Sequence, residues 1–283
     1  MRFRTDATFI SIRAKLANSM DMNHMPRAGS AGFDIYIGEA GKDCRHAGTA
    51  QPTPGEVDLE RVVFNDPNLP SDMRDWRINF PLYGGTTCVE IGLPPNAKIE
   101  PPTPHKIKPI LFYGSSITQG GCASRPGNNY CSMLCRAVDA EQINLGFSGC
   151  GKGEPAVAKA IASLDLSVFI MDYDHNAPSV EHYRETHEPF YKTVREKHPD
   201  MPIIMASKPD YSIIEAKERK AIIRRTYLNA KRRGENVYFI DGETLFGTED
   251  RESCTSDLCH PNDLGFLRMA EGIGRAVTDI LGL

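Results

Sequence analysis

The sequence predicts an α/β fold for residues 105–283, because short apolar runs alternate there with longer segments of helical apolar spacing. Such alternation favours a parallel sheet with helices on both faces and right-handed connections. Residues 1–104 instead contain short stretches of alternating apolar residues separated by Gly, Pro and Asp. We therefore expect a flavodoxin-like parallel sheet, preceded by a small antiparallel β-sandwich or jelly-roll-like domain.

The first domain is expected to consist of short antiparallel strands. These strands are indicated at residues 8–13, 33–37, 78–82 and 89–93. Gly84 and Gly85 separate the last two, which predicts a β-hairpin. Prolines then accumulate from Pro94 to Pro104, which is typical of a stiff connector. We place the boundary near Pro104, so that the domains span residues 1–104 and 105–283.

The second domain is expected to alternate strands with helices along its whole length. The strands are indicated at residues 110–113, 143–145, 168–171, 203–207 and 237–240. The helices are indicated at residues 130–138, 157–164, 183–198, 223–230 and 266–280. The last of these carries a long amphipathic stripe that closes the chain.

The first strand of the second domain leads into a turn rich in hydroxyl groups. Gly114 ends the apolar run and is followed by Ser115, Ser116 and Thr118. Open α/β folds keep their ligands at the carboxyl ends of the strands, which is where this turn is expected to lie. Ser116 is therefore the candidate nucleophile.

A serine hydroxyl attacks poorly unless a neighbouring base takes its proton. Asp257 and His260 form an Asp-x-x-His unit, in which the carboxylate can reach the imidazole and fix its tautomer. This predicts His260 as the base and Asp257 as its partner. His175 is an alternative base, but it lacks an Asp-x-x-His carboxylate.

Four segments, in this order, resemble the four sequence blocks of the SGNH (GDSL-type) hydrolases. They are GSSIT at 114–118, NLGFSG at 144–149, Asn176 within DYDHNAP, and DLCHPN at 257–262. The resemblance implies Ser116 as nucleophile, Asp257 and His260 as the rest of a triad, and the N–H of Ser116 with Gly149 and Asn176 as an oxyanion hole. One departure is visible, since the Gly-Asp-Ser of the family reads Gly114-Ser115-Ser116 here.

The first domain carries a resemblance of its own. Residues 32–36 read Gly-Phe-Asp-Ile-Tyr, which is similar to the Gly-x-Asp-Leu-Tyr signature of a domain that precedes some SGNH hydrolases.

Gly149 and Asn176, like Ser116, each follow a predicted strand, so three passes of the chain deliver them to one rim of the sheet. An oxyanion can approach the backbone N–H of a glycine closely, and the Asn176 amide can donate to the same oxygen. Taken singly, a turn glycine and a turn-capping amide would explain the two residues equally well.

The composition is that of an ordinary soluble protein, with 40% hydrophobic and 25% charged residues. A net charge of -4 without a long basic run disfavours a nucleic-acid partner. The N-terminal residues show no signal-peptide pattern and no segment approaches the length of a membrane span, so we expect a cytoplasmic protein without a membrane partner. The oligomeric state is left open, and a homo-oligomer is one alternative.

Neither a metal nor a cofactor is predicted. The eight cysteines form no Cys-x-x-Cys pair, so reduced thiols that act as small apolar filler are preferred to a redox or metal role. His182 and His187 lie five residues apart among glutamates, which indicates a solvated helix face rather than a zinc site. The glycines at 114–121 lack the lysine of a phosphate-binding P-loop.

The sequence thus predicts a metal-independent serine esterase that acts through an acyl-enzyme. The resemblance implies small acyl esters as substrates, with acetyl groups on a sugar or xylan fragment as the leading expectation. An acyltransferase that uses the same triad is one alternative, and a non-catalytic carbohydrate-binding protein is another.

Overall fold

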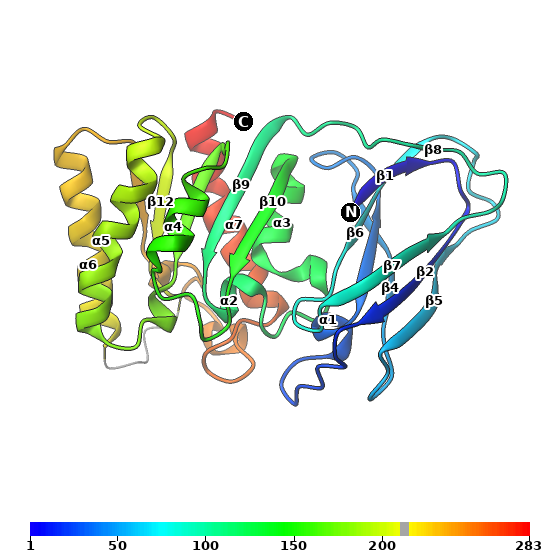
Figure 1. The fold of residues 1–283 in the computed structure, drawn as a ribbon, viewed down its shortest axis with the longest axis horizontal. Helices are drawn as coiled ribbons and strands as arrows, with labels where there is room; N and C mark the ends of the chain where they lie inside the picture. The colour runs from blue at the N-terminus through cyan, green and yellow to red at the C-terminus, as the bar shows by residue number, and fades with distance from the viewer. Residues whose placement is uncertain (210–214) are drawn as a thin grey trace. The chain divides into compact units, whose positions relative to one another are not determined.

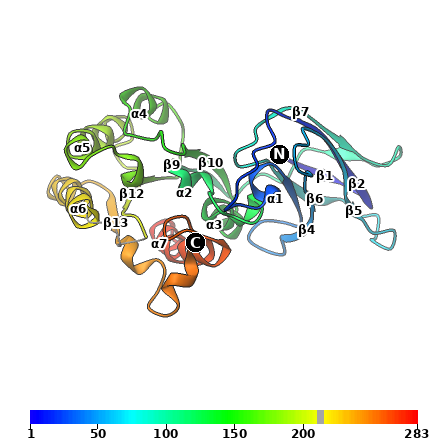
Figure 2. The same cartoon turned by 90° about the horizontal axis from the view of Figure 1, so that it is seen from below.

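The structure is a computed structural model, and it describes residues 1–209 and 215–283. It forms two compact units, and Figures 1 and 2 label most of their helices and strands. The first unit comprises Met1–Lys106 and Gly120–Asp139, and the second comprises Ile107–Gln119 and Ala140–Leu283. The domain boundary near Pro104 stays a prediction, since a compact unit is not by itself a domain that folds alone.

The first unit contains two antiparallel sheets, as predicted. Its elements are β1 (Arg2–Thr5), β2 (Phe9–Leu16), α1 (Arg27–Ser30), β3 (Phe33–Ile37), β4 (Arg45–Ala50), β5 (Asp58–Asn65), β6 (Arg74–Asn79), β7 (Thr86–Gly92), β8 (Ile99–Glu100), a 3-10 turn η1 (Pro126–Asn128) and α3 (Tyr130–Val138). The strand orders are β4-β3-β6-β1-β8 and β5-β2-β7. Alternate residues such as Ile10, Ile12, Phe33 and Ile35 are fully buried in one core.

The predicted hairpin between residues 78–82 and 89–93 is wrong, because its two strands belong to different sheets. β6 pairs with β1 and β3, whereas β7 pairs with β2. The connection is anchored elsewhere: the backbone N–H of Leu82 bonds the carbonyl of Gly29, and those of Tyr83 and Gly84 bond Ser30. These hydrogen bonds to α1 hold the segment that connects the two sheets, so Gly84 and Gly85 do not form a two-residue hairpin turn.

The second unit is the predicted parallel sheet. Its elements are β9 (Ile107–Gly114), α2 (Ser116–Gln119), β10 (Ala140–Gly146), α4 (Pro155–Ile161), β11 (Val168–Asp172), η2 (Asp174–Asn176), α5 (Val180–Lys197), β12 (Ile203–Ala206), α6 (Ala216–Arg232), β13 (Val237–Ile240), η3 (Gly242–Thr244), η4 (Arg251–Cys254) and α7 (Asp263–Leu281). The order is β10-β9-β11-β12-β13, and every pair is parallel. This is the flavodoxin-like order, which confirms the predicted fold class.

Helices cover both faces of this sheet. Leu111, Tyr113, Phe169 and Met171 point to one face, where they form a single core with buried residues of α4, α5 and α6. The alternate residues, such as Phe112 and Ile170, are also fully buried. They point to the opposite face, on which Figure 2 shows α7.

Several helix boundaries follow from capping side chains. Asn129 caps α3, Ser179 caps α5 and Asn262 caps α7, each by accepting a hydrogen bond from a backbone N–H of the first turn. Such a cap stabilises a helix by about 1 kcal/mol. The Ser179 cap explains why α5 begins three residues before the predicted helix start at Tyr183.

Candidate active site

Ser116 is the first residue of α2, which follows the carboxyl end of β9. β9 lies between β10 and β11, where the strand order reverses, and open α/β sheets bind ligands at this place. A Cβ on Gly114 would lie 2.0 Å from Thr118 Oγ1 and 2.3 Å from the carbonyl oxygen of Asp172. The turn that places Ser116 at the rim of the sheet therefore requires glycine at position 114.

Ser115 helps to hold this turn, although the motif that the turn resembles has Asp at this position. Ser115 is fully buried, and its Oγ accepts a hydrogen bond from the N–H of Ile117 at 3.2 Å. Its carbonyl accepts the N–H of Gln119 at 3.0 Å. On the neighbouring strand β10, Asn144 Nδ2 donates to the carbonyl of Thr118 at 2.7 Å. The serine thus supplies the acceptor that the start of a short helix needs.

The structure brings Ser116, His260 and Asp257 together in one chain of hydrogen bonds. Ser116 Oγ lies 2.9 Å from His260 Nε2, and His260 Nδ1 lies 2.8 Å from Asp257 Oδ2. Burial raises the pKa of Asp257, but hydrogen bonds from the backbone N–H and the ring of His260 outweigh it and keep that pKa below its usual value. The carboxylate is thus held in its charged form, which stabilises an imidazolium beside it.

Hydrogen bonds of Asp257 fix the conformation of the loop that carries His260. The second carboxylate oxygen, Oδ1, accepts the backbone N–H of His260 at 2.7 Å and that of Cys259 at 3.1 Å. Leu258 has a left-handed backbone with a φ of 66°, which turns the chain back on itself. Asn262 caps α7, so His260 lies two residues before the cap of this helix. These contacts fix both ends of the Asp-x-x-His segment.

Asn176 is bonded to the loop that carries Gly149. Asn176 Nδ2 donates to the carbonyl of Phe147 at 2.7 Å, and the N–H of Phe147 donates to the carbonyl of Gly114 at 3.0 Å. Gly149 has a φ of 69°, and nothing lies within 4 Å of an ideal Cβ there. The positive φ therefore explains why a glycine occupies position 149. An amide nitrogen carries two N–H groups, so Asn176 keeps a second donor for another acceptor.

His175, the alternative base, lies beside the same loop. Its Nδ1 is 3.9 Å from the sulfur of Cys259, whereas the hydroxyl of Ser116 bonds His260. The geometry thus favours His260 as the base. The contact between Cys259 and His175 was not predicted, since a lone cysteine carries no sequence signal of such a contact.

The predicted solvated face for His182 and His187 is wrong. His187 is 1% exposed and its Nδ1 lies 2.9 Å from Thr226 Oγ1 of α6, while His182 Nε2 lies 2.8 Å from the carbonyl of Lys152. Burial lowers the pKa of His187 to about 3. The spacing to Tyr183 and to the apolar residues from Phe190 onward places His187 on the apolar face of α5, and this signal could have identified it.

We expect the stability of the protein to fall at acidic pH because of His187. Its folded pKa of about 3 lies below that of an unfolded histidine, about 6.5, so the unfolded chain binds a proton first. The stabilisation is therefore full above about pH 6.5 and is lost by about 1.4 kcal/mol per pH unit as the pH falls toward 3. Urea unfolding of the wild type and of His187→Gln between pH 7.5 and 4.5 measures this slope.

The matched control is His182→Gln on the same helix, which leaves His187 in place and should retain the wild-type slope. Equal slopes for the wild type and His187→Gln would show that His187 does not titrate in this way.

Within residues 1–209 and 215–283, which contain all eight cysteines, no disulfide bond is formed. Cys122, Cys131, Cys135 and Cys254 are buried, as expected for small apolar filler, but Cys88 and Cys150 are exposed. The prediction that the cysteines serve as buried apolar side chains is therefore wrong for Cys88 and Cys150.

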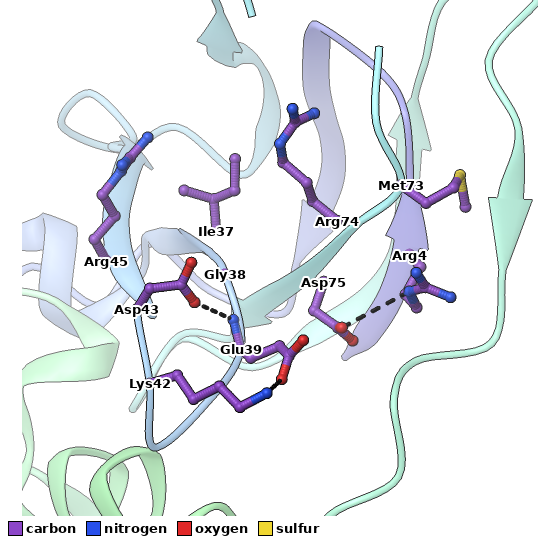
Figure 3. Close-up of a pocket in the computed structure, with 10 residues that line it drawn as sticks. All are labelled: Arg4, Ile37, Gly38, Glu39, Lys42, Asp43, Arg45, Met73, Arg74 and Asp75. Carbon is purple, nitrogen blue, oxygen red and sulfur yellow. Dashed lines mark hydrogen bonds and ion pairs between the residues drawn. The ribbon is translucent and has the colours of Figure 1, made fainter. Parts of the chain in front are cut away.

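A cavity of about 320 Å³ lies in the first unit (Figure 3). Its charged residues are Arg4, Lys42, Arg45, Arg74, Glu39, Asp43 and Asp75. Most of them are paired: Lys42 bonds Glu39, Arg4 Nε lies 3.8 Å from Asp75, and Arg74 lies 3.2 Å from Asp72. Because its charges are largely satisfied by the wall itself, the cavity does not indicate a particular ligand.

The fold and the hydrogen-bonded Ser116, His260 and Asp257 define a class, namely α/β proteins with the side-chain arrangement of serine hydrolases. Comparison with family models narrows the class. Residues 107–278 match the GDSL-like lipase/acylhydrolase family, and residues 1–99 match the domain found at the N-terminus of SGNH-hydrolase-type esterases. The chain therefore belongs to the GDSL-like lipase/acylhydrolase family, and it is an enzyme of the carboxylic ester hydrolase class. This confirms the resemblance found in the sequence.

Solved structures agree with this assignment. A protein described as a GDSL-like lipase from Bacteroides ovatus ATCC 8483 is 33% identical, with a TM-score of 0.87 over 99% of this chain and 84% of that one. A salicylyl-acyltransferase from a tetracycline biosynthetic pathway is 21% identical (TM-score 0.79; 100% and 82% covered). A family two carbohydrate esterase from Clostridium thermocellum, in complex with cellohexaose, is 15% identical (TM-score 0.72; 99% and 92% covered). A search of curated proteins found no match.

Among residues 1–209 and 215–283, no helix has both the length and the apolar character needed to cross a membrane.

Proposed function

We propose that the protein is a serine esterase that hydrolyses small acyl esters, chiefly acetyl esters of carbohydrates, through an acyl-enzyme. The observation that carries this proposal is the continuous hydrogen-bond chain from Ser116 Oγ through His260 to Asp257. A nucleophile, a base and an orienting carboxylate within hydrogen-bond reach are the parts that acyl transfer to a serine requires.

In the first half of the reaction, Ser116 Oγ attacks the ester carbonyl carbon while its proton passes to His260 Nε2. Asp257 accepts the hydrogen bond from Nδ1–H, which keeps Nε2 free to take that proton and stabilises the imidazolium. The tetrahedral intermediate collapses, the carbon–oxygen bond to the alcohol breaks, and the alcohol oxygen takes the proton from His260. The acyl group remains on Ser116.

In the second half, His260 removes a proton from a water molecule that attacks the acyl carbon. The carboxylic acid leaves, and Ser116 Oγ regains its proton from His260. The oxyanion of each tetrahedral intermediate is held by the N–H groups of Ser116 and Gly149 and by the amide of Asn176. Loss of one such donor costs about 3 to 4 kcal/mol of transition-state stabilisation.

The carbohydrate part of the proposal rests on the family and on the fold shared with a carbohydrate esterase that binds cellohexaose. A non-catalytic carbohydrate-binding protein would not need the three hydrogen-bonded side chains, so we do not favour it. The cytoplasmic location stays a prediction, and so does the oligomeric state.

An acyltransferase is the second candidate, and the salicylyl-acyltransferase of the same fold is the observation that favours it. Both activities form the same acyl-enzyme and differ only in whether water or another alcohol attacks it. The triad therefore does not distinguish them.

We expect hydrolysis to be fastest for acetyl esters and to decline with longer acyl chains. The test is a panel of acyl esters of rising chain length, assayed together with acetylated sugars. A protein that prefers long chains and leaves acetylated sugars intact would contradict the proposed substrate class. Product analysis with added alcohols separates the two candidates: free acetate as the main product supports the esterase, whereas transfer to the alcohol in preference to water supports the acyltransferase.

A further inference from the structure

We infer that Arg219 is a positioning residue for Asn176, the side-chain donor of the proposed oxyanion hole. Arg219 lies on α6 and holds the backbone on both sides of Asn176. The inference rests on the proposed function and adds to it a residue that acts only through another side chain. Both residues, and all the contacts that carry the inference, belong to the second unit.

The turn that carries Asn176 is too short to keep its conformation without outside contacts. η2 spans three residues, Asp174–Asn176, and in it the N–H of Asn176 bonds the carbonyl of Tyr173 at 3.2 Å. Short 3-10 turns have poor hydrogen-bond geometry, and nucleating a helical turn costs more than one hydrogen bond returns. The place of Asn176 at the rim of the sheet therefore depends on the neighbours of η2.

Arg219 supplies two contacts of this kind. It is 9% exposed, and its Nη1 donates to the carbonyl of Asp174 at 2.7 Å and to that of Ala177 at 2.9 Å. Asp174 and Ala177 are 1% and 4% exposed, and a buried carbonyl without a partner costs about as much as a lost hydrogen bond. One guanidinium thus joins the first residue of η2 to the residue that follows Asn176.

The guanidinium of Arg219 is itself held in place. Its Nε and Nη2 donate to Oε2 of Glu215 at 3.2 and 2.7 Å. A planar guanidinium that is paired along one edge presents its remaining donors in a fixed direction. A lysine has a single ammonium group and no such edge. The two carbonyls are therefore bonded by a rigid donor.

A second anchor of η2 reaches only its first residue. The backbone N–H of Lys208, just beyond β12, donates to Asp174 Oδ2 at 3.0 Å. Arg219 also bonds Ala177, on the other side of Asn176. Without it, the backbone after Asn176 can shift while Asp174 stays in place. A displacement of a reacting or stabilising group by about 1 Å can reduce a rate by about 100-fold. Loss of the Arg219 donors should therefore lower kcat.

The test compares Arg219→Met with Arg195→Met, since methionine keeps much of the side-chain volume and removes every donor. Arg195 is a matched control because it is also a buried arginine of the second unit, 6% exposed, that bonds backbone carbonyls. Its Nη1 donates to the carbonyls of His198, Pro199 and Met201 at 2.7, 2.9 and 2.8 Å. These carbonyls precede β12, at the amino end of the parallel sheet, whereas η2 follows β11 at the carboxyl end.

We expect Arg219→Met to lower kcat for an activated acetyl ester about 10- to 100-fold, with KM within about twofold of wild type. The split arises because an oxyanion donor acts on the transition state and not on the bound ester. Arg195→Met should leave kcat within about twofold of wild type at a comparable loss of thermal stability.

A double-mutant cycle shows whether Arg219 acts through Asn176. Asn176→Ala alone should lower kcat about 100- to 1,000-fold, as expected for the loss of one oxyanion donor. In the Asn176→Ala background, Arg219→Met should lower kcat by less than about twofold further, since the donor that it positions is already absent. An arginine that only stabilised the fold would reduce kcat by the same factor in both backgrounds.

Amide hydrogen exchange gives a readout that does not depend on activity. In Arg219→Met, peptides covering residues 173–177 should exchange faster than in wild type, whereas Arg195→Met should leave them unchanged. If Arg219→Met does not fold, Arg219→Lys replaces it. This variant keeps the charge but cannot keep the Glu215 pair and both carbonyls, so it should lower kcat in the same direction and lose its effect in Asn176→Ala.

Three results would overturn the inference: equal losses of kcat in Arg219→Met and Arg195→Met, equal factors in the two backgrounds, or a folded Arg219 variant with wild-type kcat or wild-type exchange at residues 173–177. Active wild-type protein whose kcat is unchanged by Asn176→Ala would also overturn it and leave the esterase standing. The proposed function fails separately, if wild-type protein hydrolyses no acyl ester and takes up no fluorophosphonate at Ser116, and the positioning role then falls with it.

Discussion

Ser116→Ala should abolish ester hydrolysis, with kcat reduced by roughly 10⁶-fold. In the proposed mechanism the hydroxyl oxygen forms the acyl-enzyme, and neither His260 nor Asp257 can replace it. What remains is the catalysis that substrate binding and the oxyanion donors supply on their own. The measurement is kcat for an activated acetyl ester, with the protein concentration set by absorbance.

Folding should be retained in this variant. Ser116 Oγ bonds one side chain, that of His260, and a single hydrogen bond contributes about 1 kcal/mol. The backbone of the turn is held independently by Ser115 and by Asn144. Circular dichroism and thermal unfolding close to those of the wild type would show that activity is lost because the hydroxyl is missing, and not because the protein is unfolded.

Ser148→Ala is the matched control, because Ser148 is an exposed serine on the loop after β10. It should keep wild-type activity. A fluorophosphonate probe should give one adduct, on the peptide that contains Ser116, and none in Ser116→Ala. An adduct on Ser115 or Ser148, or an active Ser116→Ala, would contradict the assignment of the nucleophile.

The parallel sheet could be predicted from the sequence because its signals are local. The three central strands β9, β11 and β12 contain apolar runs buried on both faces, as in residues 110–113, and the helices carry apolar stripes of their own. The predicted limits of α3 and β13 agree with Tyr130–Val138 and Val237–Ile240 in the structure. In these segments the same spacing of apolar residues predicts the secondary structure and provides the side chains that pack against the core.

The errors concern non-local features. Strands were expected at residues 78–82 and 89–93, which overlap the end of β6 and most of β7. The strands with which these two pair lie far away in the chain, as Phe3 does from Trp76. The inclusion of Gly120–Asp139 in the first unit likewise depends on Asp34, about ninety residues upstream. Turn residues such as Gly84 and Gly85 report local bending and not the identity of the pairing partner.

The candidate site combines a contact that is local in sequence with one that is not. The contact from Asp257 to His260 spans one turn of chain and follows from spacing, whereas Ser116 and His260 are 144 residues apart. No periodicity predicts such a distant pair. It was predicted because a serine nucleophile needs a base, and because the motifs resemble those of a family. The role of Ser115 as an acceptor for Ile117 appeared only in the structure, because it depends on the geometry of the turn.

Asp257→Asn should lower kcat by roughly 10⁴-fold while changing stability little. The carboxylate uses Oδ1 to accept two backbone N–H groups, from Cys259 and His260, and Oδ2 to accept the ring Nδ1–H. An asparagine must keep its carbonyl oxygen on the two backbone donors, which turns its NH₂ group toward Nδ1. The imidazole proton then moves to Nε2, so His260 presents a donor where it should accept the proton of Ser116. The measurements are kcat and the rate of fluorophosphonate labelling of Ser116, and both should fall in Asp257→Asn.

The matched control is Glu252→Gln in η4, an exposed carboxyl group, which should retain wild-type kcat. A loss of less than about tenfold in both kcat and labelling rate of Asp257→Asn would show that Asp257 does not determine the tautomer of His260.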